Sequence, residues 1–166
     1  MGVGKTTIGK QLSLELNQPF YDSDHVICER TGVSIPTIFE LEGEQGFRQR
    51  EMAVIDELSA QSGIILATGG GAVLQESNRQ YLQQRGIVIY LHALPHILYE
   101  RTRSDKNRPL LQVDNPLGKL QELYQLRDPI YRHTAHHTID AGQNNCQQTI
   151  QHILQLLPQR NPVCKP

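Results

Sequence analysis

The 166-residue sequence predicts an α/β fold built on a parallel sheet. Short, continuous apolar runs alternate along the chain with amphipathic helical patterns, as in units where a helix crosses between two parallel strands. In addition, Gly4-Lys5-Thr6 directly precedes a helical pattern. A glycine, a lysine and a hydroxyl residue at the start of a helix are typical of loops that bind phosphate groups in such folds.

The first elements are predicted from apolar spacing and from capping residues. Apolar side chains recur every four positions over residues 5–16, which predicts an amphipathic helix. Residues 19–22 form a short strand candidate that ends in the polar turn Asp22-Ser23-Asp24. Ser34 followed by Pro36 indicates a cap and an early helical proline, which together open a helix to about residue 41.

The later elements follow from the same patterns. Apolar spacing predicts a helix over residues 48–60, and the wholly apolar run at 64–67, which precedes three glycines, predicts a buried parallel strand. A polar segment at 104–116 interrupts the pattern and is expected to be a mobile lid. The remaining expected elements are a strand at 87–91, a helix at 95–103, a helix at 117–123, a strand at 138–140 and a helix at 150–157.

Composition and charge restrict the function classes. The 16 basic and 17 acidic side chains give a net charge of −1, which argues against a surface that coats nucleic acid. No apolar run approaches the ~20 residues of a membrane span, and we expect no signal peptide. The three cysteines lack C-x-x-C spacing, which is typical of reduced thiols in a cytoplasmic protein. We expect a single domain at 1–157 and a flexible tail at 158–166.

The opening residues are the second half of a phosphate-binding loop. The full pattern is G-x-x-x-x-G-K-[ST], and Gly4, Lys5 and Thr6 supply its last three fixed positions, so that its first glycine falls before Met1. Backbone N–H groups of such a loop surround phosphate oxygens, the lysine reaches the β- and γ-phosphates, and the hydroxyl binds Mg²⁺. The loop predicts an ATP- or GTP-dependent phosphoryl-transfer enzyme; a chance glycine–lysine helix start is the alternative.

Two clusters downstream could carry chemistry. Asp22 and Asp24 follow a strand, where one carboxylate could hold Mg²⁺ and the other could face a substrate hydroxyl; a solvated turn is the alternative. Gly69, Gly70 and Gly71 also follow a strand. Three glycines carry a large backbone entropy cost, which favours a close approach to a ligand over a merely flexible loop.

Four arginines are candidates for binding anionic groups. Arg108 lies in the polar segment at 104–116, where a lid arginine could stabilise charge on a transferring phosphate. Arg48, Arg101 and Arg127 are individually unremarkable, because most arginines are solvated or paired at a surface.

Taken together, six segments resemble the shikimate kinase family. They occur in the family's order and span nearly the whole chain: Met1-Gly2-Val3-Gly4-Lys5-Thr6-Thr7-Ile8-Gly9, Phe20-Tyr21-Asp22-Ser23-Asp24, Gly43-Glu44-Gln45-Gly46-Phe47-Arg48, Thr68-Gly69-Gly70-Gly71-Ala72-Val73, Arg108-Pro109-Leu110-Leu111 and Arg127-Asp128-Pro129-Ile130-Tyr131. The resemblance implies a three-layer P-loop fold like the nucleoside monophosphate kinases, with a parallel sheet of strand order 2-3-1-4-5. It also implies transfer of the ATP γ-phosphate to the 3-hydroxyl of shikimate, on the route to chorismate and the aromatic amino acids.

The resemblance implies a nucleotide end of the site. Its nucleotide-binding residues would be Gly2, Val3, Gly4, Lys5, Thr6, Thr7, Arg101 and Arg108. Lys5 would contact the β- and γ-phosphates, and Arg108 would act from the lid. Arg101 would pack near the adenine. Thr6 and Asp22 would hold Mg²⁺.

The resemblance implies an acceptor end as well. Asp24 would bind shikimate hydroxyls and accept a proton, which makes Lys5, Asp24 and Arg108 the expected catalytic residues. Arg48 and Arg127 would grip the shikimate carboxylate, with Gly69, Gly70 and Gly71 lining the same pocket. Two guanidinium forks suit a planar carboxylate because each can bind it bidentately. We expect Asp24 to stay ionised beside Mg²⁺ and the arginines.

One departure from the family pattern concerns strand 1. Family members carry a strand and the first glycine of the loop before the point where this sequence begins, and that strand is central in their fold. The strands at 64–67 and 87–91 would then lie on either side of a gap. A central strand buries about four or five apolar side chains at ~1.5–3 kcal/mol each, which is comparable with a domain's whole stability of roughly 5–15 kcal/mol. We therefore expect a natural start upstream of Met1, and an unstable or poorly active 166-residue chain.

Two alternative functions remain open. Another small-molecule kinase of the same fold, such as a gluconate kinase, would share the phosphate loop, whereas Arg48, Arg127 and the triple glycine favour shikimate. A non-catalytic, kinase-like binding protein would lack a phosphate, metal or acceptor residue, yet Lys5, Asp22 and Asp24 are present. We expect a monomer that binds ATP and shikimate, with no nucleic acid or membrane partner.

Overall fold

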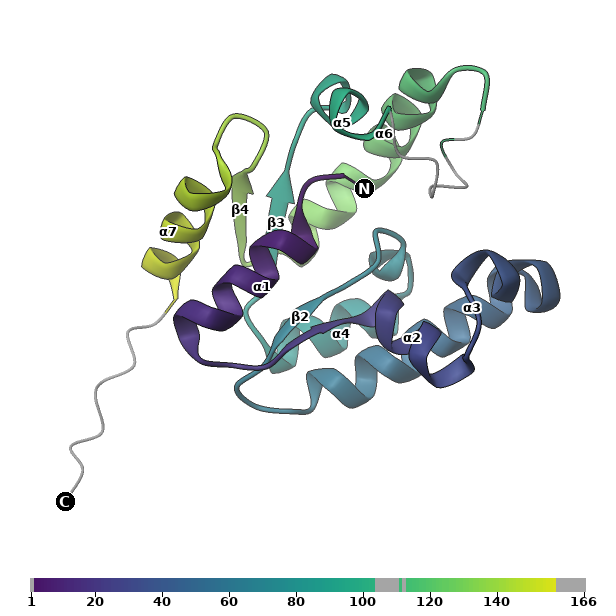
Figure 1. The fold of residues 1–166 in the computed structure, drawn as a ribbon, viewed down its shortest axis with the longest axis horizontal. Helices are drawn as coiled ribbons and strands as arrows, with labels where there is room; N and C mark the ends of the chain where they lie inside the picture. The colour runs from purple at the N-terminus through teal and green to yellow at the C-terminus, as the bar shows by residue number, and fades with distance from the viewer. Residues whose placement is uncertain (1, 104–110, 112, 158–166) are drawn as a thin grey trace.

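The computed structural model describes residues 2–103, 111 and 113–157. Helices alternate with strands along these residues (Figure 1). The elements are α1 (Lys5–Leu16), β1 (Phe20–Asp22), α2 (Ser23–Thr31), α3 (Ile35–Ser59), β2 (Ile65–Ala67), the short 3₁₀ helix η1 (Ala72–Leu74), α4 (Glu76–Arg85), β3 (Ile89–His92), α5 (Pro95–Thr102), α6 (Pro116–Thr134), β4 (His137–Asp140) and α7 (Cys146–Leu156). Most of the lid expected at 104–116, including Arg108, lies outside the described residues, as does the tail at 158–166.

The strands among the described residues form two parallel pairs. β1 pairs with β2, with Tyr21 opposite Leu66, and β3 pairs with β4, with Tyr90 opposite Thr138. Within the described part of the chain, no hydrogen-bonded ladder joins β2 to β3. The α/β fold with parallel strands is therefore confirmed, and β2 and β3 belong to different pairs.

Helices α1 and α7 cover one face of the strand pairs. Ile8 and Leu12 of α1 are buried against Ile139 of β4 and against Ile150 and Ile153 of α7. Half-buried apolar side chains of both β2 and β3 join this cluster. In Figure 1, α1 runs between the β1–β2 pair and the β3–β4 pair. The shared cluster thus links two strand pairs that no ladder connects.

Helices α2 and α3 cover the opposite face of β1 and β2. This second cluster contains Val26, Ile27, Ile38, Phe47, Val54 and Leu58, with Tyr21 and Leu66 from the strands. Ile65 and Leu66 are neighbours in β2 but enter opposite clusters, as the alternation of side chains along a strand requires. The strands therefore form a layer between two helical layers.

One local prediction was wrong, and another needs adjusted bounds. The expected polar turn at 22–24 is the start of α2, because the Asp22 side chain accepts a hydrogen bond from the Asp24 N–H at 3.2 Å and caps the helix. The two helices expected at 34–41 and 48–60 both lie within α3, whose N-cap is Ser34 as predicted. Gly43 divides α3 into two helical segments, because its φ of 67° and ψ of −176° are non-helical, and the second segment begins earlier than expected.

Helix α4 has no counterpart in the sequence predictions because its sequence has little apolar periodicity. Asn78 is its fully buried residue, and the Asn78 Nδ2 donates to the Ala72 carbonyl at 2.9 Å. Arg79 Nη1 donates to the Val73 carbonyl at 2.7 Å. Polar contacts to the segment after β2 hold this helix, and such contacts leave no repeating apolar pattern.

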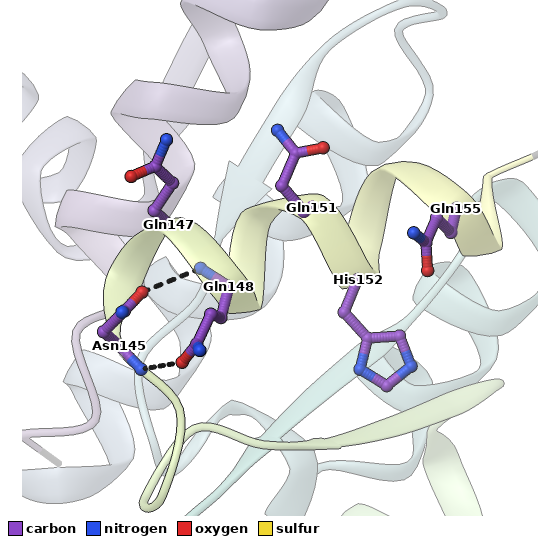
Figure 2. A pocket seen from close by; sticks show the side chains of 6 residues that line it. All are labelled: Asn145, Gln147, Gln148, Gln151, His152 and Gln155. Carbon is purple, nitrogen blue, oxygen red and sulfur yellow. Dashed lines mark hydrogen bonds between the residues drawn. The ribbon is translucent and has the colours of Figure 1, made fainter.

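Helix α7 begins with a capping box that Figure 2 shows in full. Asn145 Oδ1 accepts from the Gln148 N–H at 2.9 Å, and Gln148 Oε1 accepts from the Asn145 N–H at 3.1 Å. The outer side of the helix is polar, with Gln147 and Gln151 exposed. The cap fixes the start of the helix whose inner side closes the first core cluster.

We expect Asn145→Ala to lower the free energy of unfolding by about 1 kcal/mol, because the first-turn N–H group of Gln148 would lose its acceptor. Urea unfolding monitored by circular dichroism measures this change. Gln147→Ala is the matched control, since Gln147 is exposed in the same turn. Equal effects of the two substitutions would show that the cap does not contribute.

Candidate active site

The N-terminal end of α1 has the features of an anion-binding site. Gly4 caps the helix with φ 95° and ψ 20°, a left-handed conformation that glycine adopts without strain. No described side chain caps this end and its first turn holds no acidic residue, whereas Asp22 and Ser34 cap α2 and α3. The backbone N–H groups and the positive end of the helix dipole at this position suit phosphate oxygens.

A hydroxyl and a carboxylate meet beside this helix end. Thr6 Oγ1 donates to Asp22 Oδ2 at 2.9 Å, which connects α1 to the carboxyl end of β1. Both groups are hard oxygen ligands of the kind that Mg²⁺ prefers. Among the described residues, no group of three His, Cys, Asp or Glu side chains is placed to hold a metal ion. A cation here would therefore take few protein ligands, which is usual where phosphates supply the others.

Asp24 lies one residue into α2 and presents an unpaired oxygen. Its Oδ1 is buried and accepts no hydrogen bond from the described residues. Burial raises the pKa of Asp24, and the charge of Asp22 raises it further, while the charges of Lys5 and Arg48 lower it. Burial and the charge of Asp22 therefore outweigh the two positive neighbours in their effect on the pKa of Asp24.

The buried Glu51 adds a second unpaired carboxylate oxygen. Its Oε1 lacks a partner within the described residues, and its Oε2 accepts from Arg48 Nη1 at 2.7 Å. A Cβ atom placed on Gly69 would lie 2.7 Å from this Oε1 and 2.8 Å from Asp24 Oδ1. The two unpaired oxygens therefore converge on Gly69. Burial raises the pKa of Glu51, although the hydrogen bond from Arg48 works against it.

Arg48 lies against the end of the triple glycine. Its guanidinium also donates to Glu44 Oε1, from Nη2 at 3.0 Å, so that α3 holds it from two sides. A Cβ atom on Gly71 would lie 2.6 Å from Arg48 Cζ. Only glycine at this position lets the guanidinium approach the backbone so closely.

Arg127 reaches the middle of the triple glycine from α6. Its Nη1 donates to the Gly70 carbonyl at 3.3 Å, and the Tyr131 hydroxyl donates to the same carbonyl at 2.5 Å. Arg127 Nε is buried and donates to none of the described residues. One pocket joins this region to the phosphate loop, and its lining includes Val3, Lys5, Thr68, Gly69, Gly70, Tyr90, Tyr124, Arg127, Asp128 and Tyr131.

The structure thus brings most predicted site residues together and leaves Arg101 apart from them. Lys5, Asp24 and Arg48 are close enough for the charges of the two cations to lower the pKa of the carboxyl group. Arg101 lies on α5 at the surface, where its Nη2 donates to the Gly142 carbonyl at 3.3 Å. Arg108 lies outside the described residues.

Glu51 and Tyr131 received no role from the sequence, although each carried a detectable signal. Glu51 follows Arg48 by three residues and Tyr131 follows Arg127 by four, spacings that place two side chains on one face of a helix. The spacing alone does not single out these pairs, because polar side chains three or four residues from an arginine are common on solvated helix surfaces. Only the folded chain shows that both pairs lie at the triple glycine.

Kinases that transfer a phosphoryl group to a small acceptor place oxygen ligands for a metal ion and a carboxylate near a helix end that binds phosphate. The parallel α/β fold and the arrangement of Lys5, Thr6, Asp22 and Asp24 have these features, which define a P-loop kinase. A model of the family described as "SKI: Shikimate kinase" matches residues 1–158. The chain belongs to the shikimate kinase family, which confirms the resemblance drawn from the sequence.

Relatives and solved structures agree with this assignment. The chain is 55% identical over 157 residues to the shikimate kinase of Ralstonia nicotianae, covering 95% of this chain and 83% of that protein. The structure titled "Shikimate kinase from Acinetobacter baumannii in complex with shikimate" superposes with a TM-score of 0.90 at 52% identity, covering 94% of this chain and 87% of that one. A gluconokinase from Sinorhizobium meliloti has a TM-score of 0.57 at 16% identity, covering 93% and 85%, and shares the fold alone.

The raised pKa of Asp24 predicts how stability depends on pH. In the ligand-free protein the folded state holds the Asp24 proton more tightly than the unfolded chain does. This contribution to stability is fully present below the unfolded pKa of about 3.9 and is lost as the pH rises through the folded value. Asp24→Asn removes the titration, so its effect on stability relative to wild type should become more favourable from pH 4 to pH 7.5.

Urea unfolding of both proteins without ligands at the two pH values measures this difference. Asp114→Asn is the control, because Asp114 is exposed. An Asp24→Asn effect that is the same at both pH values would contradict a raised pKa of Asp24.

Proposed function

We propose that this chain transfers the γ-phosphate of ATP to the 3-hydroxyl of shikimate. Membership of the shikimate kinase family gives ATP-dependent phosphorylation of shikimate as the reaction. The observation that carries the proposal within the site is the convergence of two unpaired carboxylate oxygens, from Asp24 and Glu51, on Gly69. Buried acceptors without donors are costly, and the hydroxyl groups of a bound ligand would satisfy them.

At the nucleotide end, the loop before α1 holds the phosphates. Backbone N–H groups from Gly2 to Thr7 bind phosphate oxygens, and Lys5 reaches the β- and γ-phosphates. Thr6 and Asp22 hold Mg²⁺, a role that their hard oxygen atoms and 2.9 Å separation support. Mg²⁺, when bound, offsets negative charge on the phosphate oxygens.

At the acceptor end, Asp24 orients the attacking hydroxyl and accepts its proton. Its unpaired Oδ1 is the atom that takes this hydrogen bond. Arg48 and Arg127 bind the carboxylate of shikimate, since each guanidinium already lies against the triple glycine. Gly69, Gly70 and Gly71 let the backbone approach the substrate.

Two arginines farther from this centre act on the nucleotide. Arg101 packs near the adenine, and Arg108 acts at the phosphates from a lid at 104–116.

The domain extends over 1–157 and is a monomer in the cytoplasm, where Cys28 and Cys146 remain free thiols. None of the described helices combines the length and the hydrophobicity needed to cross a bilayer.

Gluconate kinase activity is the alternative within the same fold. A coupled assay of ADP release with shikimate and with gluconate as acceptors separates the two. We expect turnover with shikimate only, because gluconate is an open chain and has no ring to hold its carboxylate and a hydroxyl at a fixed separation, one at the two arginines and the other at Asp24. Turnover with gluconate alone, or with neither acceptor, would overturn the proposal.

We expect Asp24→Asn to lower kcat with shikimate by roughly 100-fold or more, the usual contribution of a positioned proton acceptor. ATP affinity measured by calorimetry should change by less than about twofold, since the amide keeps the shape of the side chain. Glu40→Gln should retain full turnover, because Glu40 is exposed on α3 and has no role in the proposal. Undiminished turnover of the Asp24→Asn variant would exclude Asp24 from the reaction.

Gly71→Ala tests the close approach of Arg48. The added methyl would meet the guanidinium, while the backbone angle φ of −94° accepts alanine without strain. We expect the KM for shikimate to rise roughly tenfold, about the loss of one charge-assisted hydrogen bond, with an unchanged KM for ATP. Gly86→Ala is the control, because its Cβ would come no closer than 3.7 Å to the Leu82 carbonyl. An unchanged KM for shikimate would show that Arg48 does not need this space.

A further inference from the structure

We infer that Tyr131 is a positioning residue: its hydroxyl fixes the Gly70 carbonyl, and this carbonyl orients Arg127 for the carboxylate of the acceptor. The inference rests on the proposed function and assigns a role to a side chain that does not itself contact the reacting atoms.

The Gly70 carbonyl is held by two donors from one helix. Tyr131 Oη donates at 2.5 Å and Arg127 Nη1 donates at 3.3 Å, and the two residues lie one turn apart on α6. A carbonyl oxygen has two lone pairs, so both donors can bind it at once. The tyrosine bond is the shorter of the two, which is consistent with the tyrosine as the principal donor to this carbonyl.

The Tyr131 ring is itself held by the aromatic ring of Tyr90 behind the site. It stacks on Tyr90 with a centroid distance of 4.9 Å and an interplanar angle of 29°. Tyr90 Oη donates to Asp128 Oδ1 at 2.9 Å, and Asp128 Oδ2 accepts from Arg132 Nε at 2.7 Å. Burial also raises the pKa of Tyr131, so that the hydroxyl keeps its proton and remains a donor at neutral pH.

This arrangement leaves part of the Arg127 guanidinium unused. One nitrogen is occupied by Gly70, while the buried Nε donates to no described residue. Arg127, Gly70 and Tyr131 all line the pocket that also contains Lys5. An anionic group in that pocket would meet an arginine whose orientation is already set, which lowers the entropy cost of binding it.

A shortened side chain separates positioning from packing. Tyr131→Phe keeps the stacked ring and removes only the hydroxyl. We expect the KM for shikimate to rise about three- to tenfold, the range for loss of one hydrogen bond, with kcat and the KM for ATP within about twofold of wild type. Tyr90→Phe is the matched control, since its hydroxyl contacts Asp128 and not the glycines. It should change the KM for shikimate by less than about twofold.

An analogue of shikimate with a hydroxymethyl group in place of the carboxylate gives the second readout. Its inhibition constant should be the same for wild type and Tyr131→Phe, because it lacks the anion that Arg127 binds. An unchanged KM for shikimate, equal losses for shikimate and the analogue, or an equal effect of Tyr90→Phe would each overturn the inference. Wild-type protein that fails to phosphorylate shikimate would instead overturn the proposed function on which the inference rests.

Discussion

The absence of side chains at three consecutive positions after β2 is the constraint on which the acceptor end of the site depends. Atoms of Glu51, Asp24 and Arg48 occupy the space where Cβ atoms of Gly69 and Gly71 would lie. The Gly70 carbonyl receives the donors from α6 in the same turn. Three helices, α2, α3 and α6, therefore meet at one short piece of backbone, and a side chain at Gly69 or Gly71 would displace the groups that meet there.

Helix α1 connects the two strand pairs to the pocket. Its apolar side packs with both strand pairs and with α7, while its N-terminal end faces the pocket through Lys5. The Thr6 hydroxyl binds Asp22, which also caps α2. Packing of α1 between two strand pairs thus fixes its N-terminal end relative to Asp22 and the start of α2.

The sequence predicted the elements whose apolar side chains repeat, and missed those held by polar contacts. The helix at Lys5–Leu16 and the strands at Ile65–Ala67 and Ile89–His92 carry strong apolar signals and lie where they were expected, within two residues. Helix α4 is held largely through Asn78 and Arg79, which pair with carbonyl groups that no local pattern reveals. The turn expected at 22–24 was wrong because an aspartate before a serine suits a turn and a helix cap equally well.

The same distinction applies to the site. A motif names Lys5, Thr6 and the glycines because their spacing is fixed by the chemistry of phosphates and of close backbone approach. One carboxylate oxygen of Asp24 and one of Glu51 are buried without a hydrogen-bond donor among the described residues. Whether a donor is near them depends on how distant segments pack, which is a property of the whole fold. Sequence spacing shows which polar groups are near one another, whereas only the structure shows which of them remain without a partner.

Asp22 couples the two ends of the site electrostatically. One of its oxygens accepts from Thr6, the other accepts from the Asp24 backbone, and its charge raises the pKa of Asp24. Any positive charge placed against Asp22 therefore reduces the repulsion that disfavours ionised Asp24. A cation bound at Thr6 and Asp22 would therefore favour the ionised form of Asp24, which is the form that can accept a hydrogen bond and a proton from a hydroxyl group.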